Sequence, residues 1–208
     1  MTDDLLFPHP SLSDPMGILA IGGDLSPRRI LIAYARGIFP WYQDPGPILW
    51  WSPDPRLVLF PDEIRVSRSL ARVIKKQIFT VTIDQAFGKV IRACARTRPQ
   101  TWITPDMIMA YDKLHELGFA HSFESWLGEK LVGGLYGVAL GGAFFGESMF
   151  SIVSDASKVA FVFLARHLGG LGFDFIDCQT TTEHLKRFGA REIPRKEFLE
   201  RLAKAVQL

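Results

Sequence analysis

The stretch LVGGLYGVALGGAFFGESMFS, from Leu131 to Ser151, decides the fold of this chain. It combines apolar residues with six glycines, and the pair Gly141-Gly142 divides it, which predicts two antiparallel strands and their turn. Glycines inside a strand mark a bulge, or a place where a ligand or another backbone comes close. Glu147 is the one carboxylate in the stretch. It is therefore either an acidic group in an apolar pocket or a side chain turned to solvent from a core hairpin.

The composition is that of a globular protein, since 208 residues with 48% hydrophobic content are enough to bury a real core. The opening MTDDLL carries acids where a secretory signal carries basic residues, and no uncharged run reaches the roughly 20 apolar residues of a membrane helix. We therefore expect a cytoplasmic protein without a membrane segment. Two distant cysteines and five histidines without an H-x-x-x-H pair predict neither disulfides nor a metal site.

A cluster of basic residues stands out because no acid occurs between Glu63 and Asp84. On one face of a helix that begins after Ser67 lie Arg68, Arg72, Lys75 and Lys76. A row of cations of this kind suits a phosphate backbone, which makes a nucleic acid a candidate partner. A solvated basic helix without a partner would show the same spacing.

Composition also divides the chain near Pro61, because ten of its 13 prolines fall in the first 62 residues. Residues 1–61 are predicted to form a small, loop-rich unit with one clear helix, from Ser26 as N-cap to Gly37, and a strand at 56–60. In residues 62–208 we expect helices at 68–76, 84–96, 104–118, 154–170, 182–188 and 194–206, and strands at 79–83, 119–127, 131–139, 143–150 and 173–178. A meander followed by helix, strand and helix resembles the order of GNAT-type N-acetyltransferases. It predicts an α+β domain with helices on both faces of its sheet.

The segment FDFIDCQTTTEH, residues 173–184, places Asp177 and Gln179 on one face of a strand at the point where that strand ends. Side chains at such a point often belong to a site, so Asp177 is expected to emerge from the core into a cleft beside Gln179. The alternative is that Asp177 or Thr180 caps the next helix. Cys178 faces the other way and reads as a small core residue.

These residues belong to a set of motifs that resembles the leucyl/phenylalanyl-tRNA-protein transferases. The motifs are GGDLSP (22–27), RGIFPW (36–41), ILWWSPDPR (48–56), TWIT (101–104), LHELGFAHS (114–122), LVGGLYG (131–137), GESMFS (146–151), ASK (156–158), IDCQ (176–179) and EIPR (192–195). The resemblance implies a small N-terminal domain packed on an acyltransferase-like domain. It also implies an enzyme that moves Leu or Phe from its tRNA to the N-terminal Arg or Lys of a protein, which marks that protein for N-end rule degradation. We expect a monomer.

The chemistry of this reaction agrees with the residues present. An aminoacyl-tRNA ester is already activated, so the enzyme must hold the 3′ end, orient an amine and stabilise an oxyanion, without a cofactor. By the resemblance, Trp41 and Trp102 stack on the terminal adenosine, although either could be a core residue. The resemblance also makes Asp177 the catalytic carboxylate and Gln179 its partner. Both Glu147 and Asp177 could meet the cationic N-terminus of the acceptor.

An apolar pocket is expected for the side chain of the donor amino acid, and it would accept Leu, Phe or Met more easily than a residue branched at Cβ. Its predicted lining is Leu135, Phe145, Met149, Leu164, Leu168 and Ile176.

Two other functions fit part of the sequence. A CoA-dependent N-acetyltransferase needs a glycine-rich pyrophosphate loop, whereas SIVSDASKVA (151–160) has no glycine and carries Asp155. A tRNA-binding or RNA chaperone module would use the basic helix and the tryptophans, but it leaves the IDCQ and GESMF motifs without a role.

Overall fold

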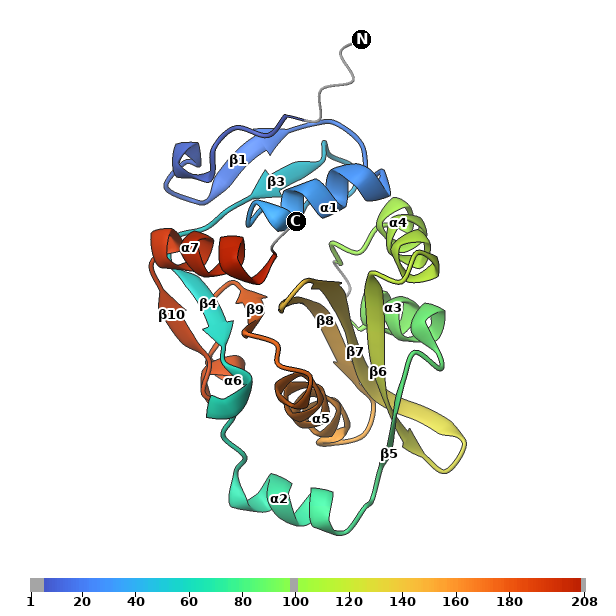
Figure 1. The fold of residues 1–208 in the computed structure, drawn as a ribbon. Coiled ribbons are helices and arrows are strands. Elements are labelled where there is room, and N and C mark those ends of the chain that lie inside the picture. The colour runs from blue at the N-terminus through green and yellow to red at the C-terminus, as the bar shows by residue number, and fades with distance from the viewer. Residues whose placement is uncertain (1–5, 98–100, 207–208) are drawn as a thin grey trace.

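The computed structural model describes residues 6–97 and 101–206, which form two sheets. A three-stranded sheet of order β1-β3-β2 lies at the N-terminal end, next to helix α1 (Figure 1). A seven-stranded sheet of order β10-β4-β9-β8-β7-β6-β5 forms the centre of the molecule. The architecture is therefore a mixed α and β fold built on a mixed sheet.

The strands are β1 (Ile18–Ile21), β2 (Phe39–Pro40), β3 (Leu49–Trp51), β4 (Arg56–Leu59), β5 (Thr80–Ile83), β6 (Ala120–Leu127), β7 (Lys130–Leu140), β8 (Ala143–Ser151), β9 (Phe175–Gln179) and β10 (Arg191–Ile193). The helices are α1 (Pro27–Ala35), α2 (Arg68–Lys75), α3 (Phe87–Arg96), α4 (Pro105–Glu116), α5 (Ala156–Gly170), α6 (Glu183–Lys186) and α7 (Arg195–Ala205), with 3₁₀ turns at Pro10–Leu12 and Pro61–Glu63.

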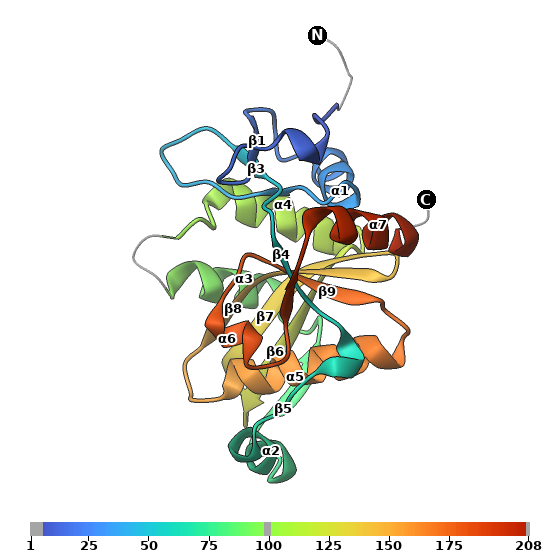
Figure 2. The same ribbon diagram turned by 90° about the vertical axis from the view of Figure 1, so that its left-hand side faces the viewer.

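Helices cover both faces of the large sheet, as the sequence predicts. Helix α5 packs on one face, whereas α3 and α4 pack on the other (Figures 1 and 2). Most of α5 is buried because apolar side chains occupy more than one side of it, which suits a helix enclosed by its neighbours. The two faces of the sheet therefore carry separate hydrophobic cores.

Local capping signals predict most helix starts correctly. The side chains of Ser26, Ser67 and Thr104 each accept a hydrogen bond from a backbone N–H in the first turn. The expectation that Asp84 caps the third helix is wrong, because α3 begins three residues later at Phe87. The Asp84 carboxylate instead accepts hydrogen bonds from the Ser122 backbone and the His121 ring.

The predicted meander is confirmed, since β6, β7 and β8 pair antiparallel through tight turns at residues 128–129 and 141–142. The glycines of β7 serve packing within the protein. A Cβ on Gly133 would lie 2.5 Å from Cβ of Ala156, at the first turn of α5. Gly133 thus lets a helix approach the sheet closely. Of the alternatives for a glycine in this strand, it is another backbone and not a ligand that comes close here.

A β-bulge interrupts the pairing of β7 with β8 at Glu147. Tyr136 pairs with Ser148 and Gly137 pairs with Gly146, so Glu147 is an extra residue in β8. Strand β8 also pairs parallel with β9, and that ladder ends at the pair Phe145 and Asp177. Beyond this point β8 and β9 are no longer paired, and the side chain of Glu147, at the bulge, reaches that of Gln179 at the end of β9.

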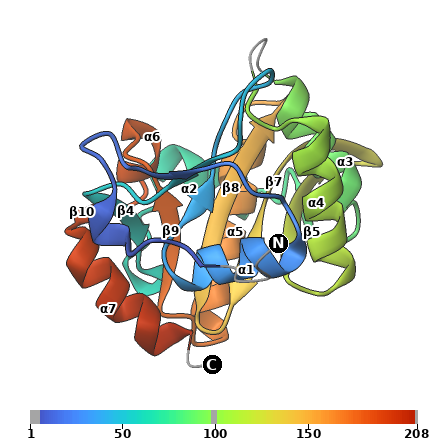
Figure 3. The ribbon, with the colours of Figure 1, turned by 90° about the horizontal axis from the view of Figure 1, so that it is seen from above.

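Strand β4 ties the N-terminal residues to the large sheet. It lies between β10 and β9, although its residues precede the predicted division at residue 61. From above, α1 and the N-terminal strands lie over one end of the large sheet (Figure 3). The division into residues 1–61 and 62–208 stays a prediction. Within residues 6–97 and 101–206, no helix is both long and apolar enough to span a bilayer.

Candidate active site

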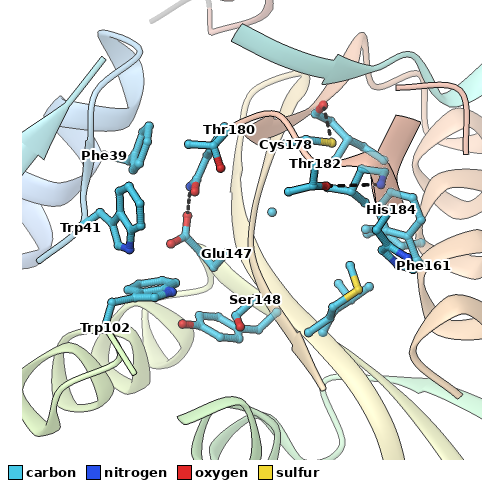
Figure 4. Close-up of a pocket in the computed structure, with 18 of the residues that line it drawn as sticks. Phe39, Trp41, Trp102, Glu147, Ser148, Phe161, Cys178, Thr180, Thr182 and His184 are labelled. Atoms are coloured by element: carbon cyan, nitrogen blue, oxygen red, sulfur yellow. Dashed lines mark hydrogen bonds between the residues drawn. The ribbon is translucent and has the colours of Figure 1, made fainter. Parts of the chain in front are cut away.

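A cavity of about 440 Å³ lies between the N-terminal segment after α1 and the separating ends of β8 and β9 (Figure 4). Its walls come from parts of the chain that are distant in sequence: residues 39–41, Trp102, residues 146–149 and residues 178–185. A pocket with apolar walls and a few convergent polar groups is the usual form of an enzyme site.

Glu147 is the polar centre of the cavity. Its Oε1 accepts hydrogen bonds from the Tyr34 hydroxyl at 2.6 Å and from Gln179 Nε2 at 2.7 Å. Its Oε2 accepts one from the Tyr111 hydroxyl at 3.2 Å, and the two tyrosine oxygens are 2.5 Å apart. Elements α1, α4, β8 and β9 thus meet at one carboxylate, and the reading of Glu147 as a solvent-facing residue is wrong.

The pKa of Glu147 is raised to about 7, chiefly by burial and to a smaller extent by the negative charge of Asp177. The hydrogen bonds from Tyr34, Tyr111 and Gln179 oppose this rise because they stabilise the ionised form. Burial and the nearby Glu147 charge hold the pKa of both tyrosines well above their usual value, so they remain donors. Glu147 is therefore able to accept and release a proton near neutral pH.

Asp177 does not line the cavity, and the expectation that it emerges into a cleft is wrong. Its side chain is fully buried, and Arg56 of β4 binds it through two hydrogen bonds, Nε to Oδ1 at 2.8 Å and Nη2 to Oδ2 at 2.7 Å. The capping alternative also fails, because the Thr182 side chain caps α6. Whether Asp177 has a catalytic role stays a prediction.

Gln179 does line the cavity, through an unusual backbone conformation. Its φ is +62°, in the left-handed region that residues other than glycine rarely adopt. Its backbone N–H donates to Asp177 Oδ1 at 2.8 Å, while its side chain reaches Glu147. Cys178 is buried and also borders the cavity, and burial raises the pKa of its thiol, which disfavours a thiolate nucleophile.

Four of the six residues predicted for the apolar pocket line the cavity: Leu135, Met149, Leu164 and Ile176. Phe145 does not, because the bulge at Glu147 changes which face of the sheet its side chain occupies. Its ring packs at 4.7 Å from the Tyr34 ring, in the core on the α1 side. Leu168 lies one turn along α5 from Leu164 and is enclosed in the α5 core. Phe161 and Leu185 border the cavity in addition.

The opposite side of the cavity is aromatic, with Phe39, Trp41 and Trp102 (Figure 4). Trp41 is 39% exposed and Trp102 is half-buried, so each keeps surface for a ligand. The structure therefore brings both predicted stacking residues to one cavity, with the apolar wall and Glu147 beside them.

Models of two families match the chain: "Leucyl/phenylalanyl-tRNA protein transferase" over residues 58–203 and the N-terminal domain of the same protein over residues 23–54. The chain belongs to the leucyl/phenylalanyl-tRNA protein transferase family. As a member of that family it is a transferase enzyme. A relative of this name from Anaeromyxobacter sp. is 62% identical over 207 residues, which cover 98% of this chain and 88% of the relative. Another from Nitrosospira multiformis is 58% identical over 211 residues, covering 99% and 91%.

The basic residues of this leucyl/phenylalanyl-tRNA protein transferase family member are not part of the cavity. Arg68, Arg72, Lys75 and Lys76 are exposed on and just after α2. That helix lies at the far end of the molecule from the N-terminal sheet (Figures 1 and 2). Their role in binding tRNA stays a prediction.

Sequence reasoning missed the three polar side chains that bind the carboxylates of Glu147 and Asp177 from other elements: Tyr34, Tyr111 and Arg56. Tyr34 and Tyr111 lie on the buried faces of α1 and α4, and their hydrogen bonds to Glu147 were not predicted. A buried tyrosine hydroxyl needs a partner, and this requirement is the signal that could have linked them to a carboxylate. For Arg56 and its partner Asp177, 121 residues away, the sequence carries no local signal.

Proposed function

We propose that this transferase moves leucine or phenylalanine, with methionine as a further donor, from aminoacyl-tRNA to the N-terminal arginine or lysine of proteins, and so marks them for N-end rule degradation. The relatives are named leucyl/phenylalanyl-tRNA–protein transferases, and that name includes both the aminoacyl-tRNA and the protein. The observation that carries the proposal is that one cavity joins an aromatic wall, an apolar wall and a carboxylate whose pKa is about 7.

The donor would occupy both walls. Trp41 and Trp102 offer faces for the terminal adenosine, since aromatic stacking holds an unpaired base without reading its sequence. The donor side chain would occupy the apolar part of the cavity, which favours a side chain that is not branched at Cβ. This part is bordered by Leu135, Met149 and Leu164. Farther away, the exposed cations of α2 would contact the phosphates of the tRNA body.

The acceptor amine would meet Glu147 and Gln179. An α-ammonium group has a pKa near ~8, so a carboxylate with a pKa of about 7 is well matched to take its proton. The freed nitrogen attacks the ester carbonyl and forms the C–N bond. The C–O bond to the ribose then breaks, and the ribose oxygen leaves with the proton that Glu147 returns. The attacking nitrogen loses its second proton to the freed Glu147 carboxylate, which passes it to solvent, so the net reaction gives the amide, the ribose hydroxyl and one proton.

Gln179 would orient the amine. An ionised Glu147 only accepts hydrogen bonds, which assigns Nε2 of Gln179 as the donor and leaves its Oε1 for an N–H of the substrate. Asp177 would act as the catalytic carboxylate, with Gln179 as its partner. Its support is the hydrogen bond from the Gln179 backbone.

The finer description of the fold is also part of this proposal. Strands β8 and β9 are parallel neighbours that stop pairing beside the cavity, which supports a GNAT-type catalytic domain in residues 62–208 behind a small domain in residues 1–61. The monomeric state and the cytoplasmic location stay predictions from the sequence.

Transfer of labelled leucine from Leu-tRNA to an Arg-initiated peptide tests the function. We expect labelled peptide with Leu-tRNA, Phe-tRNA and, more weakly, Met-tRNA, and none when the peptide's N-terminus is acetylated. A parallel reaction with labelled acetyl-CoA tests the acetyltransferase alternative. Acetylated peptide without leucine transfer would contradict the proposal, and tRNA binding without either product would favour a binding module.

A further inference from the structure

Arg56 is fully buried on β4. Its guanidinium binds both carboxylate oxygens of Asp177. It also lies between two aromatic rings, 4.7 Å from the centre of Phe39 and 4.6 Å from that of Phe198. Arg56 thus contacts the aromatic wall of the cavity through Phe39 and strand β9 through Asp177.

Stability alone explains this buried ion pair poorly. Desolvating two charges costs about as much as their attraction returns, and a well-packed apolar pair is often as stable. In addition, Nη1 of Arg56 is buried and has no hydrogen-bond partner in the described part of the chain, which adds a further cost. A group retained at such a cost is more readily explained by what it positions.

The contacts of Asp177 indicate what is positioned. Its Oδ1 accepts hydrogen bonds both from Arg56 Nε and from the backbone N–H of Gln179. Gln179 has the left-handed φ of +62°, a conformation that persists in a non-glycine residue only where its surroundings enforce it. In this conformation Gln179 Nε2 lies 2.7 Å from Glu147 Oε1.

We propose that Arg56 is a positioning residue for Gln179: by fixing Asp177 through its two-point contact, it holds Gln179 in the left-handed conformation that places the amide against Glu147. Arg56 itself touches no substrate. Asp177 acts in the same chain of contacts, since both its oxygens are engaged and its side chain is buried. The part of the test that measures kcat rests on the proposed function, whereas the part that measures the conformation of Gln179 does not.

The first experiment compares Arg56→Met with the double variant Arg56→Met/Asp177→Leu. The single change leaves a buried carboxylate unpaired, so it lowers both stability and kcat. The double change removes both charges, and thermal stability should recover. A positioning role predicts that kcat stays low in the double variant, by roughly 100-fold, with the KM for Leu-tRNA within about threefold of wild type. Recovery of kcat together with stability would overturn the proposal.

The second experiment is a double-mutant cycle with Gln179→Gly, which accepts a positive φ and has no amide to position. Arg56→Met should cause no further loss of kcat in this background, whereas independent effects would multiply. Arg191→Met is the matched control, because Arg191 also lies over an aromatic ring, Phe60, on the neighbouring strand β10 but is half exposed and lies outside the cavity. It should leave kcat unchanged. A multiplicative loss in the cycle contradicts the inference.

A structure of the double variant separates this inference from the proposed function. Gln179 should leave the left-handed region and lose its contact with Glu147. If wild type transfers no leucine, the proposed function fails while this readout still stands. If Gln179 keeps a φ near its present value and its bond to Glu147, the inference fails whatever the activity is.

Discussion

At the scale of single residues, the state of Glu147 controls what the cavity can do. Two tyrosines and Gln179 hold its carboxylate in place, while burial raises its pKa to about 7. The bulge in β8 explains why a residue in a core hairpin reaches this position. The same bulge leaves the Phe145 side chain in the other hydrophobic core. One backbone irregularity therefore explains both why Glu147 lies in the cavity and why Phe145 does not line it.

Replacing Glu147 should change how stability depends on pH. The raised pKa means that the folded protein binds a proton more tightly than the unfolded chain, whose value is 4.5. Stability from this group is therefore complete below pH 4.5 and is lost as the pH rises to about 7, by at most about 3 kcal/mol. In Glu147→Gln, the free energy of unfolding, measured by chemical denaturation, should therefore change less with pH between 4.5 and about 7 than it does in wild type. Glu129→Gln, at the exposed turn after β6, is the control.

The same variant should lose transfer activity, because an amide cannot take the proton of the amine. In wild type, kcat should rise with pH as Glu147 ionises near 7, and this limb should be absent from whatever activity Glu147→Gln retains. A Glu147→Gln enzyme with full kcat and the wild-type pH profile would rule out the carboxylate as proton acceptor.

The two cavity tryptophans should each contribute to donor binding. We expect Trp41→Ala and Trp102→Ala to weaken binding of a short 3′-terminal aminoacyl-adenosine analogue by about 1–3 kcal/mol each, since stacking is lost. Isothermal titration or competitive inhibition measures this. Trp126→Ala, on β6 outside the cavity, should bind the analogue normally. Unchanged binding in a folded Trp102→Ala protein would refute the stacking role.

At the scale of elements, α2 shows how far a local pattern reaches. Its Ser67 cap, its bounds and its exposed cations agree with the sequence, because all depend on residues within two turns. Its position far from the cavity could not be read in the same way. It is decided by the packing of α2 against α5.

Reversing charge on α2 should weaken tRNA binding through its salt dependence. Arg68→Glu/Arg72→Glu removes two phosphate contacts, so the slope of log affinity against log salt should fall by roughly two units. Lys196→Glu/Lys204→Glu, on exposed positions of α7, makes the same charge change elsewhere. If both double variants shift the slope equally, the effect is one of net charge and α2 is no specific surface.

At the scale of the whole molecule, β4 makes the N-terminal residues part of the central sheet. It pairs with both β9 and β10 and carries Arg56, the partner of Asp177. Residues 39–41 meanwhile form one wall of the cavity. The site is therefore built from both the N-terminal residues and the elements of the central sheet.

A fragment of residues 62–208 should fail to fold as it does in the full chain. Without β4, strand β9 loses a neighbour and Asp177 becomes a buried charge without its counter-ion, a loss that typically costs several kcal/mol. A fragment of residues 56–208 restores β4 and is the matched control. Circular dichroism and thermal unfolding compare the two. A cooperative transition of the shorter fragment at the full-length temperature would contradict the prediction.

The sequence by itself determined most of the helix starts, the meander with its turns, the helices on both faces of the sheet and, through the resemblance of its motifs, the family. Caps, turns and apolar periodicity act over a few residues, which is why they can be read along the chain. Only the tertiary structure decided that Asp177 faces Arg56, 121 residues away, and that Tyr34 reaches Glu147 across 113 residues. It also decided at which residue of β8 the bulge lies, and therefore which side chains of that strand point to each face of the sheet. Such contacts depend on strand register and on packing between distant segments, which leave no mark on neighbouring residues.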